Sequence, residues 1–389
     1  MCSLFLPLIL LAHIPSLLNG EKICCPDGEC YSMDPPWRSL IRPVPAPNCV
    51  EKVQYLLYTR SNPSTAFNFS SENTSLEGSY FDASKPTMFF FHGWRGSVIH
   101  SSHPSMASSY LVSVDANVFL VDYSDVASNL YYPQPVSDLR VLARIVARFV
   151  RYIVDKKGVS KDGIHLMGLS LGAHLVGYIG KEVPGIRRIT GLDPAGPLFK
   201  GEDCQVRLCK GDGQFVESVQ TNKKYVLGFG TPREDYDVTF AMNGGMDQPS
   251  CGIDLIDLAV SHSQSRSDNN SKALVPSLSC SHEKSQVYYT EALRVPNCTF
   301  WGIKEDIYKR LVSVLSLGHG AKIFVPSREC EFPTCLPMGI HTIDYPASGV
   351  YIVPTNTKEP YCIKKPETSE DMKEVTIWNK PLKLLLGIF

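Results

Sequence analysis

The 389-residue sequence predicts an α/β fold built on a mostly parallel sheet. Several short apolar runs lack the alternation of a half-exposed strand, which indicates strands buried on both faces. Between two of these runs lies a stretch with the apolar periodicity of a helix, so strands and helices alternate along the chain. Right-handed connections between such units bring the carboxyl ends of the strands, and the reactive groups that follow them, to one edge of the sheet.

Composition and charge narrow the functional class. The formal net charge is -1 and Lys and Arg form no dense cluster, so we expect no nucleic-acid partner. Residues 1–20 form an apolar stretch too short to cross a membrane, which predicts a signal peptide, and no later segment is long enough to span a bilayer. With Cys2 removed, an even number of the 13 cysteines remains, so disulfides and an extracellular, secreted protein are expected. Glycosylation sequons that fit this expectation stand at Asn68, Asn73, Asn269 and Asn297.

The elements follow in order along the chain. Three cysteines, Cys24, Cys25 and Cys30, crowd the mature N-terminus, where one pair is expected to staple the chain. The stretch 61–84 is polar and is expected to be a loop. A long helix over 137–157 is predicted by apolar residues that step by three and four, with Gly158 at its end. Strands are expected at 53–58, 87–91, 117–122, 188–192 and 214–219.

The turn at residues 164–174 is the feature around which the fold is organised. An apolar run ends in Gly168-x-Ser170-x-Gly172, and a small-residue helix start follows. Strand, tight turn and helix in this order indicate a nucleophile elbow, in which the serine adopts a strained backbone conformation. Side chains at the two glycines would collide with the adjoining strand and helix. A chance match in a loop is the alternative, which the flanking strand and helix disfavour.

A serine hydroxyl needs a base to take its proton and an acid to orient that base. Asp193 is the candidate acid because it ends the next predicted strand, although a turn or cap role is the alternative. His282 is the favoured base because it follows Cys280 by two residues and opens a helical run, so a disulfide-anchored loop would position it. The histidines that follow Asp193 are His262, His282, His319 and His341.

The oxyanion of the tetrahedral intermediate needs two preorganised N–H donors. Leu171, directly after the nucleophile, supplies one. The loop after the 87–91 strand should supply the other, which makes Trp94 the candidate.

Five motifs occur together in the chain: Phe91-His92-Gly93-Trp94, Gly168-Leu169-Ser170-Leu171-Gly172-Ala173-His174, Gly191-Leu192-Asp193-Pro194-Ala195-Gly196-Pro197, Asn243-Gly244-Gly245 and Cys280-Ser281-His282. Together they resemble the pancreatic lipase family of secreted triacylglycerol lipases and phospholipases A1. The resemblance spans most of the chain, from Cys30 to Cys362, and implies an α/β-hydrolase fold with a central, mostly parallel sheet, a nucleophile elbow and a disulfide-bracketed lid. It assigns the catalytic roles to Ser170, Asp193 and His282, with backbone donors at Trp94 and Leu171.

The resemblance also implies two disulfides. A Cys251–Cys280 bond would bracket the lid, residues 251–280. Pancreatic-type relatives hold calcium in the loop after the aspartate strand, but two of the expected carboxylate positions are Cys204 and Cys209 here and only Asp212 remains. Because a hard cation needs carboxylate oxygens, we expect no metal and no other cofactor. A local Cys204–Cys209 bond, similar to that of venom-type phospholipases A1, is expected instead.

The same resemblance divides the chain into a signal peptide (1–20), a catalytic domain (21–363) and a short tail (364–389). The tail is too short for the β-sandwich that pancreatic lipases carry there, and an edge strand is the interpretation we favour for it. Where the family has His-Thr-Asp, this chain has Gln220-Thr221-Asn222, to which the sequence assigns no role.

The expected function is that of a secreted lipid carboxylic-ester hydrolase, triacylglycerol lipase-like, with a Ser-His-Asp acyl-enzyme mechanism and glycerolipid substrates at a lipid–water interface. Phospholipase A1 activity is the alternative: the short loop 221–237 favours phospholipids, whereas the long lid favours neutral glycerides. We weight the lid more because it controls access to the serine. A non-catalytic lipid-binding or yolk-type protein is less favoured, because such relatives are expected to lack the serine.

Overall fold

The computed structural model describes residues 20–50, 52–98, 102–223, 229–231, 235–246, 248–251, 275–294, 299–305, 322–323, 332–363 and 375–376. The predicted signal peptide up to residue 19, the lid residues 252–274, and the sequons at Asn269 and Asn297 lie outside these residues. So do His262 and His319, and most of the tail.

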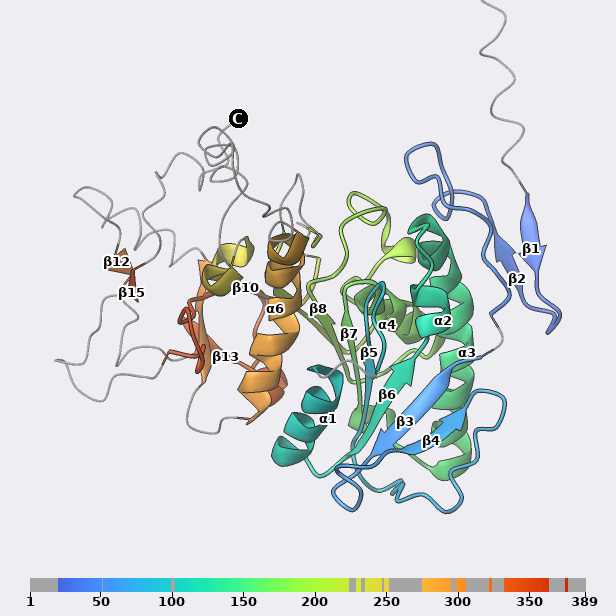
Figure 1. Ribbon diagram of the computed structural model, residues 1–389, viewed down its shortest axis with the longest axis horizontal. Helices are drawn as coiled ribbons and strands as arrows, with labels where there is room; N and C mark the ends of the chain where they lie inside the picture. Colours follow the sequence, from blue (N-terminus) through green and yellow to red (C-terminus); the bar gives the residue numbers. More distant parts are fainter. Residues whose placement is uncertain are drawn as a thin grey trace, which may run out of the picture.

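Within the described residues, a sheet of 11 strands forms the centre of the molecule, in the order β13-β11-β14-β10-β9-β8-β7-β5-β6-β3-β4 (Figure 1). Its strands are β3 (Gln54–Tyr58), β4 (Phe67–Ser70), β5 (Thr87–Phe91), β6 (Asn117–Asp122), β7 (Ile164–Leu169), β8 (Arg188–Leu192), β9 (Phe215–Gln220), β10 (Val238–Met242), β11 (Phe300–Lys304), β13 (Cys335–Met338) and β14 (Gly349–Val353). Two small antiparallel pairs lie outside it, β1 (Lys22–Cys24) with β2 (Cys30–Ser32) and β12 (Lys322–Ile323) with β15 (Val375–Thr376).

The helices connect these strands. The α-helices are α1 (Ser102–Ser113), α2 (Ser124–Ala127), α3 (Pro133–Lys157), α4 (Leu171–Glu182) and α6 (Val275–Arg294). Short 3-10 helices are η2 (Lys161–Gly163), η3 (Cys204–Val206), η4 (Asn243–Gly245), η5 (Pro249–Cys251) and η6 (Ile340–Asp344). None of the helices that the structure describes combines the length and apolar character needed to cross a bilayer.

The mostly parallel sheet predicted from the sequence is confirmed. From β6 across to β14, neighbouring strands pair in parallel, whereas β3, β4, β11 and β13 add antiparallel edges. Because parallel strands end at the same edge of a sheet, the residues that follow β5, β7, β8 and β9 meet there.

Two helical layers bury the sheet on both faces (Figure 1). Helices α3 and α4 pack together on one face, and α1 and α6 pack together on the other. Successive residues of β5 serve the two layers: Phe89 joins the cluster around α3, and Phe90 joins the cluster around α1. Every residue of β5 is buried, which is why its sequence shows no alternation.

Local differences from the sequence predictions have physical causes. The stretch 61–84 is not all loop, because β4 pairs with β3 there. Its alternating Phe67 and Phe69 bring aromatic rings onto the sheet, with Phe69 stacked 5.0 Å from Tyr55. The predicted helix 137–157 begins earlier, at Pro133, which is favoured in a first turn, and it ends as expected at Gly158 with φ 79°. The N-terminus is stapled by two disulfides, Cys24–Cys30 and Cys25–Cys49.

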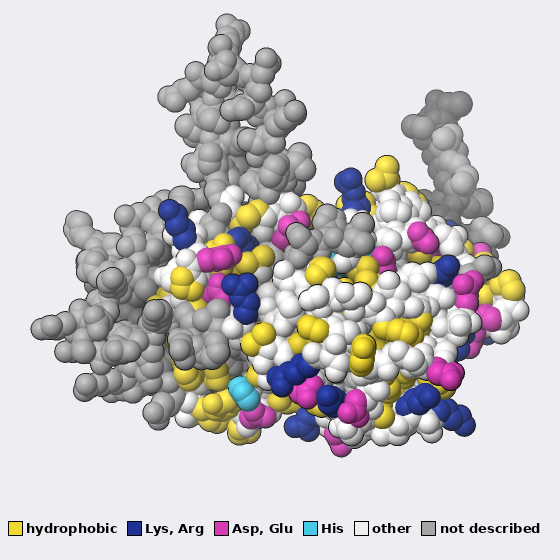
Figure 2. Space-filling view, turned by 60° about the horizontal axis from the view of Figure 1, so that its bottom comes forward, with side chains coloured by type: hydrophobic (Ala, Val, Ile, Leu, Met, Phe, Trp, Pro, Cys, Tyr) yellow, Lys and Arg dark blue, Asp and Glu magenta, His cyan; other side chains and the backbone are white. Residues whose placement is uncertain are grey.

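On the face shown in Figure 2, basic and acidic side chains are intermixed and hydrophobic side chains are scattered among them.

Candidate active site

Ser170 joins β7 to α4 in the strained conformation expected of an elbow. Its φ is 58° and its ψ is -116°. The Ser170 N–H donates to Leu192 O of β8 at 2.9 Å, and its carbonyl accepts from Ala173 N at 3.1 Å. A Cβ atom on Gly168 would lie 2.1 Å from Gly172 O, and one on Gly172 would lie 2.4 Å from Phe91 O. Both glycines are therefore sterically required, as the motif predicted.

Asp193 and His282 form a direct hydrogen bond, although 89 residues separate them in the chain. The Nδ1 of His282 lies 2.6 Å from Oδ2 of Asp193, and Asp193 is completely buried. Because a carboxylate oxygen accepts, we assign the proton to Nδ1, which leaves Nε2 as the acceptor. This is the tautomer that a base needs to take a proton from a serine.

His282 lies inside α6 rather than in a loop at a helix start. The helix begins at Val275, seven residues earlier than His282, so the predicted local context was wrong. The proline at position 276, in the first turn, is the signal that marks this start. The disulfide between Cys251 and Cys280, the pairing that the resemblance implied, fixes the helix two residues before the histidine.

The loop after β5 reaches the serine. A Cβ atom on Gly93 would lie 2.8 Å from Ser170 Cβ and 3.5 Å from Ser170 Oγ, so the backbone of this loop packs against the nucleophile. Trp94 is anchored by its indole N–H, which donates to Asn129 O at 2.8 Å. Leu171 opens α4 directly behind the serine. The structure thus brings together the segments carrying all five residues predicted for the reaction.

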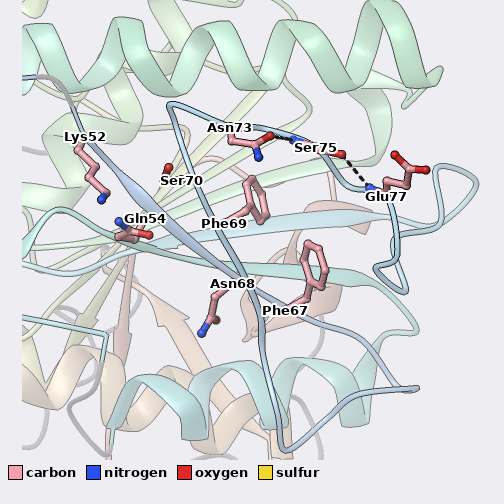
Figure 3. Close-up of a pocket in the computed structure, with 9 residues that line it drawn as sticks. All are labelled: Lys52, Gln54, Phe67, Asn68, Phe69, Ser70, Asn73, Ser75 and Glu77. Atoms are coloured by element: carbon pink, nitrogen blue, oxygen red, sulfur yellow. Dashed lines mark hydrogen bonds between the residues drawn. The ribbon is translucent and has the colours of Figure 1, made fainter.

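The hollow shown in Figure 3 lies elsewhere. It has a volume of about 620 Å³ and follows the edge strand β4, and none of Ser170, Asp193 and His282 lines it. Its lining includes the sequon residues Asn68 and Asn73, both exposed.

Comparison with known families matches the description "Lipase" over residues 21–361. The chain belongs to the lipase family. It is therefore a carboxylic-ester hydrolase of lipid substrates, on an α/β-hydrolase fold.

A phospholipase A1 of Vespa crabro is 28% identical over 337 residues, which cover 82% of this chain and 98% of that protein. The pancreatic triacylglycerol lipase of Homo sapiens is 30% identical over 301 residues, which cover 75% of this chain and 63% of that protein. Lipase member H-A of Xenopus laevis is 33% identical over 263 residues, which cover 66% of this chain and 52% of that protein.

In this lipase, the backbone after β9 holds the buried carboxylate. Oδ1 of Asp193 accepts from Thr221 N at 2.9 Å and from Asn222 N at 3.1 Å. Sequence analysis assigned these residues no role, because every residue except proline carries the same backbone N–H. Asn222 can therefore stand where the family has Asp without loss of this contact, because the donor is its backbone N–H.

A second contact sets the position of the carboxylate. A Cβ atom on Gly230 would lie 2.6 Å from Oδ1 of Asp193, so only glycine allows this approach. Asn222 holds Gly230 in place, because Asn222 O accepts from Gly230 N at 3.0 Å and Asn222 Oδ1 accepts from Phe229 N at 2.8 Å. The ring of Phe229 lies 5.6 Å from the ring of His282, so this short segment borders both the acid and the base.

Gln248, which sequence reasoning missed, links the acid to the helix that bears the base. Its side-chain amide donates to Thr221 O at 3.0 Å and to Met242 O at 2.9 Å. Its backbone N–H donates to Ser281 Oγ at 3.0 Å, next to His282. Asn243 completes the arrangement by donating to Gln248 Oε1 at 2.8 Å. A Gln five residues after Asn243, the first residue of the Asn-Gly-Gly motif, is the only sequence signal of this linkage.

His174, the last residue of the elbow motif, is a structural residue. Its Nδ1 accepts from Leu208 N at 3.1 Å, and its Nε2 donates to Ala195 O at 2.8 Å. The imidazole stacks on Phe199 and is completely buried. It thereby ties α4 to the loop that follows Asp193.

The loop that holds calcium in pancreatic-type relatives has a different donor set here. Cys204 and Cys209 form a disulfide with an S–S distance of 2.08 Å. Oδ2 of Asp212 accepts from Lys181 Nζ at 2.7 Å and from Cys209 N at 2.9 Å. Lys181 Nζ also donates to Arg207 O at 3.0 Å. An ammonium group already takes the carboxylate and carbonyl oxygens that a hard cation would need, so these residues do not fit calcium.

We predict that His174 makes the fold sensitive to acid. Burial lowers the pKa of His174 to about 3 from its ordinary value of 6.5, so between these values the unfolded chain binds a proton that the folded chain does not. Stability should therefore fall as the pH drops below 6.5, by up to about 1.4 kcal/mol per pH unit. The free energy of unfolding, measured with urea at pH values between 7 and 5, should have a shallower slope against pH for His174→Gln than for the parent protein. His341→Gln, at an exposed histidine, should keep the slope of the parent protein. Equal slopes for all three would contradict the prediction.

We also predict that a calcium chelator changes neither the melting temperature nor the hydrolysis rate. Lys181→Met should destabilise the protein by roughly 2–3 kcal/mol with or without chelator, because it leaves the mostly buried Asp212 carboxylate unpaired. Lys210→Met is the matched control, since Lys210 is 65% exposed where it pairs with Asp237 and should contribute less than about 1 kcal/mol. Loss of activity in chelator that added calcium restores would disprove the prediction.

Proposed function

We propose that this lipase-family protein hydrolyses glycerolipid esters through an acyl-enzyme formed on Ser170. The observation that carries the proposal is the 2.6 Å hydrogen bond from His282 Nδ1 to the buried Asp193, beside a serine in a strained elbow. Ser170 Oγ attacks the ester carbonyl carbon while His282 Nε2 takes its proton. The same proton then passes to the departing alcohol, and water repeats the sequence to release the fatty acid.

Two electrostatic contributions favour this reaction. Asp193 remains hydrogen-bonded to His282 and stabilises the imidazolium that forms during attack. The backbone N–H groups of Trp94 and Leu171 donate hydrogen bonds to the carbonyl oxygen, where negative charge develops during the attack. Removing one such donor typically costs about 10²–10³-fold in turnover. The contact of Gly93 with Ser170, and the start of α4 at Leu171, support this assignment.

For the substrate class, we propose neutral glycerides as the main substrates and phospholipids as the second candidate. The 29-residue separation of the bonded Cys251 and Cys280 leaves room for a long lid, which favours glycerides. The Cys204–Cys209 disulfide and the 98% coverage of the Vespa crabro phospholipase A1 favour the second candidate.

We further propose that the protein is secreted. Disulfides at Cys24–Cys30, Cys25–Cys49, Cys204–Cys209 and Cys251–Cys280 support this, because such bonds form and persist in oxidising compartments.

Replacement of the nucleophile is the direct test. Ser170→Ala should reduce turnover of a soluble monomeric ester by about 10⁶-fold, since the remaining groups cannot form an acyl-enzyme. The melting temperature should not fall, because the substitution removes only a hydroxyl. Ser61→Ala, at an exposed serine, is the control and should retain full activity. A few per cent of residual activity in the pure Ser170→Ala protein would place the nucleophile elsewhere.

The substrate class is tested by hydrolysis rates on triolein and phosphatidylcholine, measured side by side. We expect the higher rate on triolein, together with a rise in turnover of a short-chain glyceride as its concentration crosses the solubility limit. Replacing residues 255–272 by a short Gly/Ser linker should abolish this rise. The apolar side chains of the lid, such as Leu255, Ile256 and Leu258, can be buried against a lipid surface, and this burial would shift the lid toward its open state. A smooth increase for both proteins, with phosphatidylcholine the better substrate, would favour phospholipase A1 activity.

A further inference from the structure

Four large apolar side chains are strongly exposed on two neighbouring loops. Leu40 and Ile41 are 84% and 82% exposed, and Leu130 and Tyr131 are 75% and 59% exposed. Scattered apolar residues are common on protein surfaces, but two adjacent pairs on loops that meet at one place are a concentrated apolar feature. We call these four residues the apolar rim.

Hydrogen bonds fix both loops to the same segment. Arg42, directly after Ile41, donates from Nε to Leu198 O at 2.9 Å. Tyr132, directly after Tyr131, donates from its hydroxyl to Pro197 O at 3.3 Å. Both pairs therefore flank the segment 197–198, which lies four to five residues beyond Asp193.

The chain that follows each pair makes a further contact, because the first turns of α3, which follow Tyr132, bond to the segment 45–46, which follows Arg42. Gln134 Nε2 donates to Ala46 O at 3.0 Å, and Ser137 Oγ donates to Pro45 O at 2.7 Å. Arg42 itself is buried, and its guanidinium lies 5.6 Å from the ring of Phe199. These contacts fix the backbone that follows each pair, while the four apolar side chains of the rim remain exposed.

The rim stands close to the reacting serine. The ring of Trp94 meets the ring of Tyr132 edge-on at 5.2 Å, and its indole donates to Asn129 O, the residue before Leu130. Gly93, directly before Trp94, packs on Ser170. The loops that carry Trp94 and Leu130 come after the carboxyl ends of β5 and β6, and the segment 197–198 comes after β8, so the rim lies at the same edge of the sheet as Ser170.

We propose that the apolar rim is a docking surface for the lipid–water interface, which it enters when the enzyme acts on aggregated lipid. The proposal rests on the proposed function, because it takes the substrate of Ser170 to be a water-insoluble ester. A lipid surface fits better than a protein partner, because a serine that must reach lipid lies beside the exposed side chains. Burial of four such side chains in an acyl-chain layer removes a large apolar area from water.

The test compares binding with chemistry on the full chain. Two double variants, Leu40→Ser with Ile41→Ser and Leu130→Ser with Tyr131→Ser, are made in the active protein and in the Ser170→Ala background. Flotation with a triolein emulsion coated with phosphatidylcholine measures binding in the inactive background, where no lipid is consumed. Each pair should lower the partition coefficient by at least about tenfold. Hydrolysis of a soluble monomeric ester by the active variants should stay within about twofold of the parent.

Val112→Ser is the matched control. Val112 is 59% exposed, but it lies near the end of α1, which leads back to the opposite edge of the sheet, so its replacement should leave flotation unchanged. If the partition coefficients of the rim variants lie within twofold of that of the parent protein, the proposal is overturned. The proposal is also overturned if the parent protein is a dimer in solution and the rim variants are monomers that float as the parent does. The rim would then be a contact between copies of the chain.

The two hypotheses fail in different ways. If the rim substitutions reduce hydrolysis of the soluble ester by the same factor as they reduce flotation, they damage the active site itself. That result would overturn the docking role of the rim. A parent protein that floats with lipid through the rim, but hydrolyses no ester, would overturn the proposed function and leave the rim as a lipid-binding surface.

Discussion

The buried charge of Asp193 is the constraint on which the arrangement of the site depends. An ionised carboxylate without partners in a protein interior costs several kcal/mol, so the chain must supply donors around it. Here they come from the end of β9, through the N–H groups of Thr221 and Asn222, and from His282 on α6. Segments distant in sequence are thus drawn to one point because an unsatisfied carboxylate would be less stable. Stability and catalytic geometry are in this respect the same requirement.

That requirement extends outward through backbone groups. Gln248 bonds to Thr221 O and lies beside Ser281, so it couples the donors of the acid to the helix of the base. Gly230 closes the other side of Asp193, where any larger residue would displace the carboxylate. The candidate site is therefore positioned by residues other than Ser170, Asp193 and His282, and most of them act through main-chain atoms.

This division explains what the sequence could predict. The elbow around Ser170 was predictable because steric demands at Gly168 and Gly172 impose residue types on a short stretch. The buried strands were predictable because burial on both faces leaves a continuous apolar run. The early start of α6 was missed because the cysteine at position 280 was taken as part of a loop, although Pro276, a residue favoured in the first turn of a helix, precedes it. The donors at Thr221 and Asn222 were missed for a different reason, since every residue except proline offers the same N–H.

The placement of His282 within α6 has a consequence for how this region can change over evolution. Each residue of an α-helix advances the side-chain direction by about 100°. Farther along the same helix, Tyr289 is buried and its hydroxyl accepts from the buried Arg188, which fixes the rotation of the helix about its axis. Deleting one residue between these positions would turn the imidazole away from Asp193, whereas a histidine in a loop could absorb the change. The segment from His282 to Tyr289 should therefore tolerate substitutions far better than changes in length.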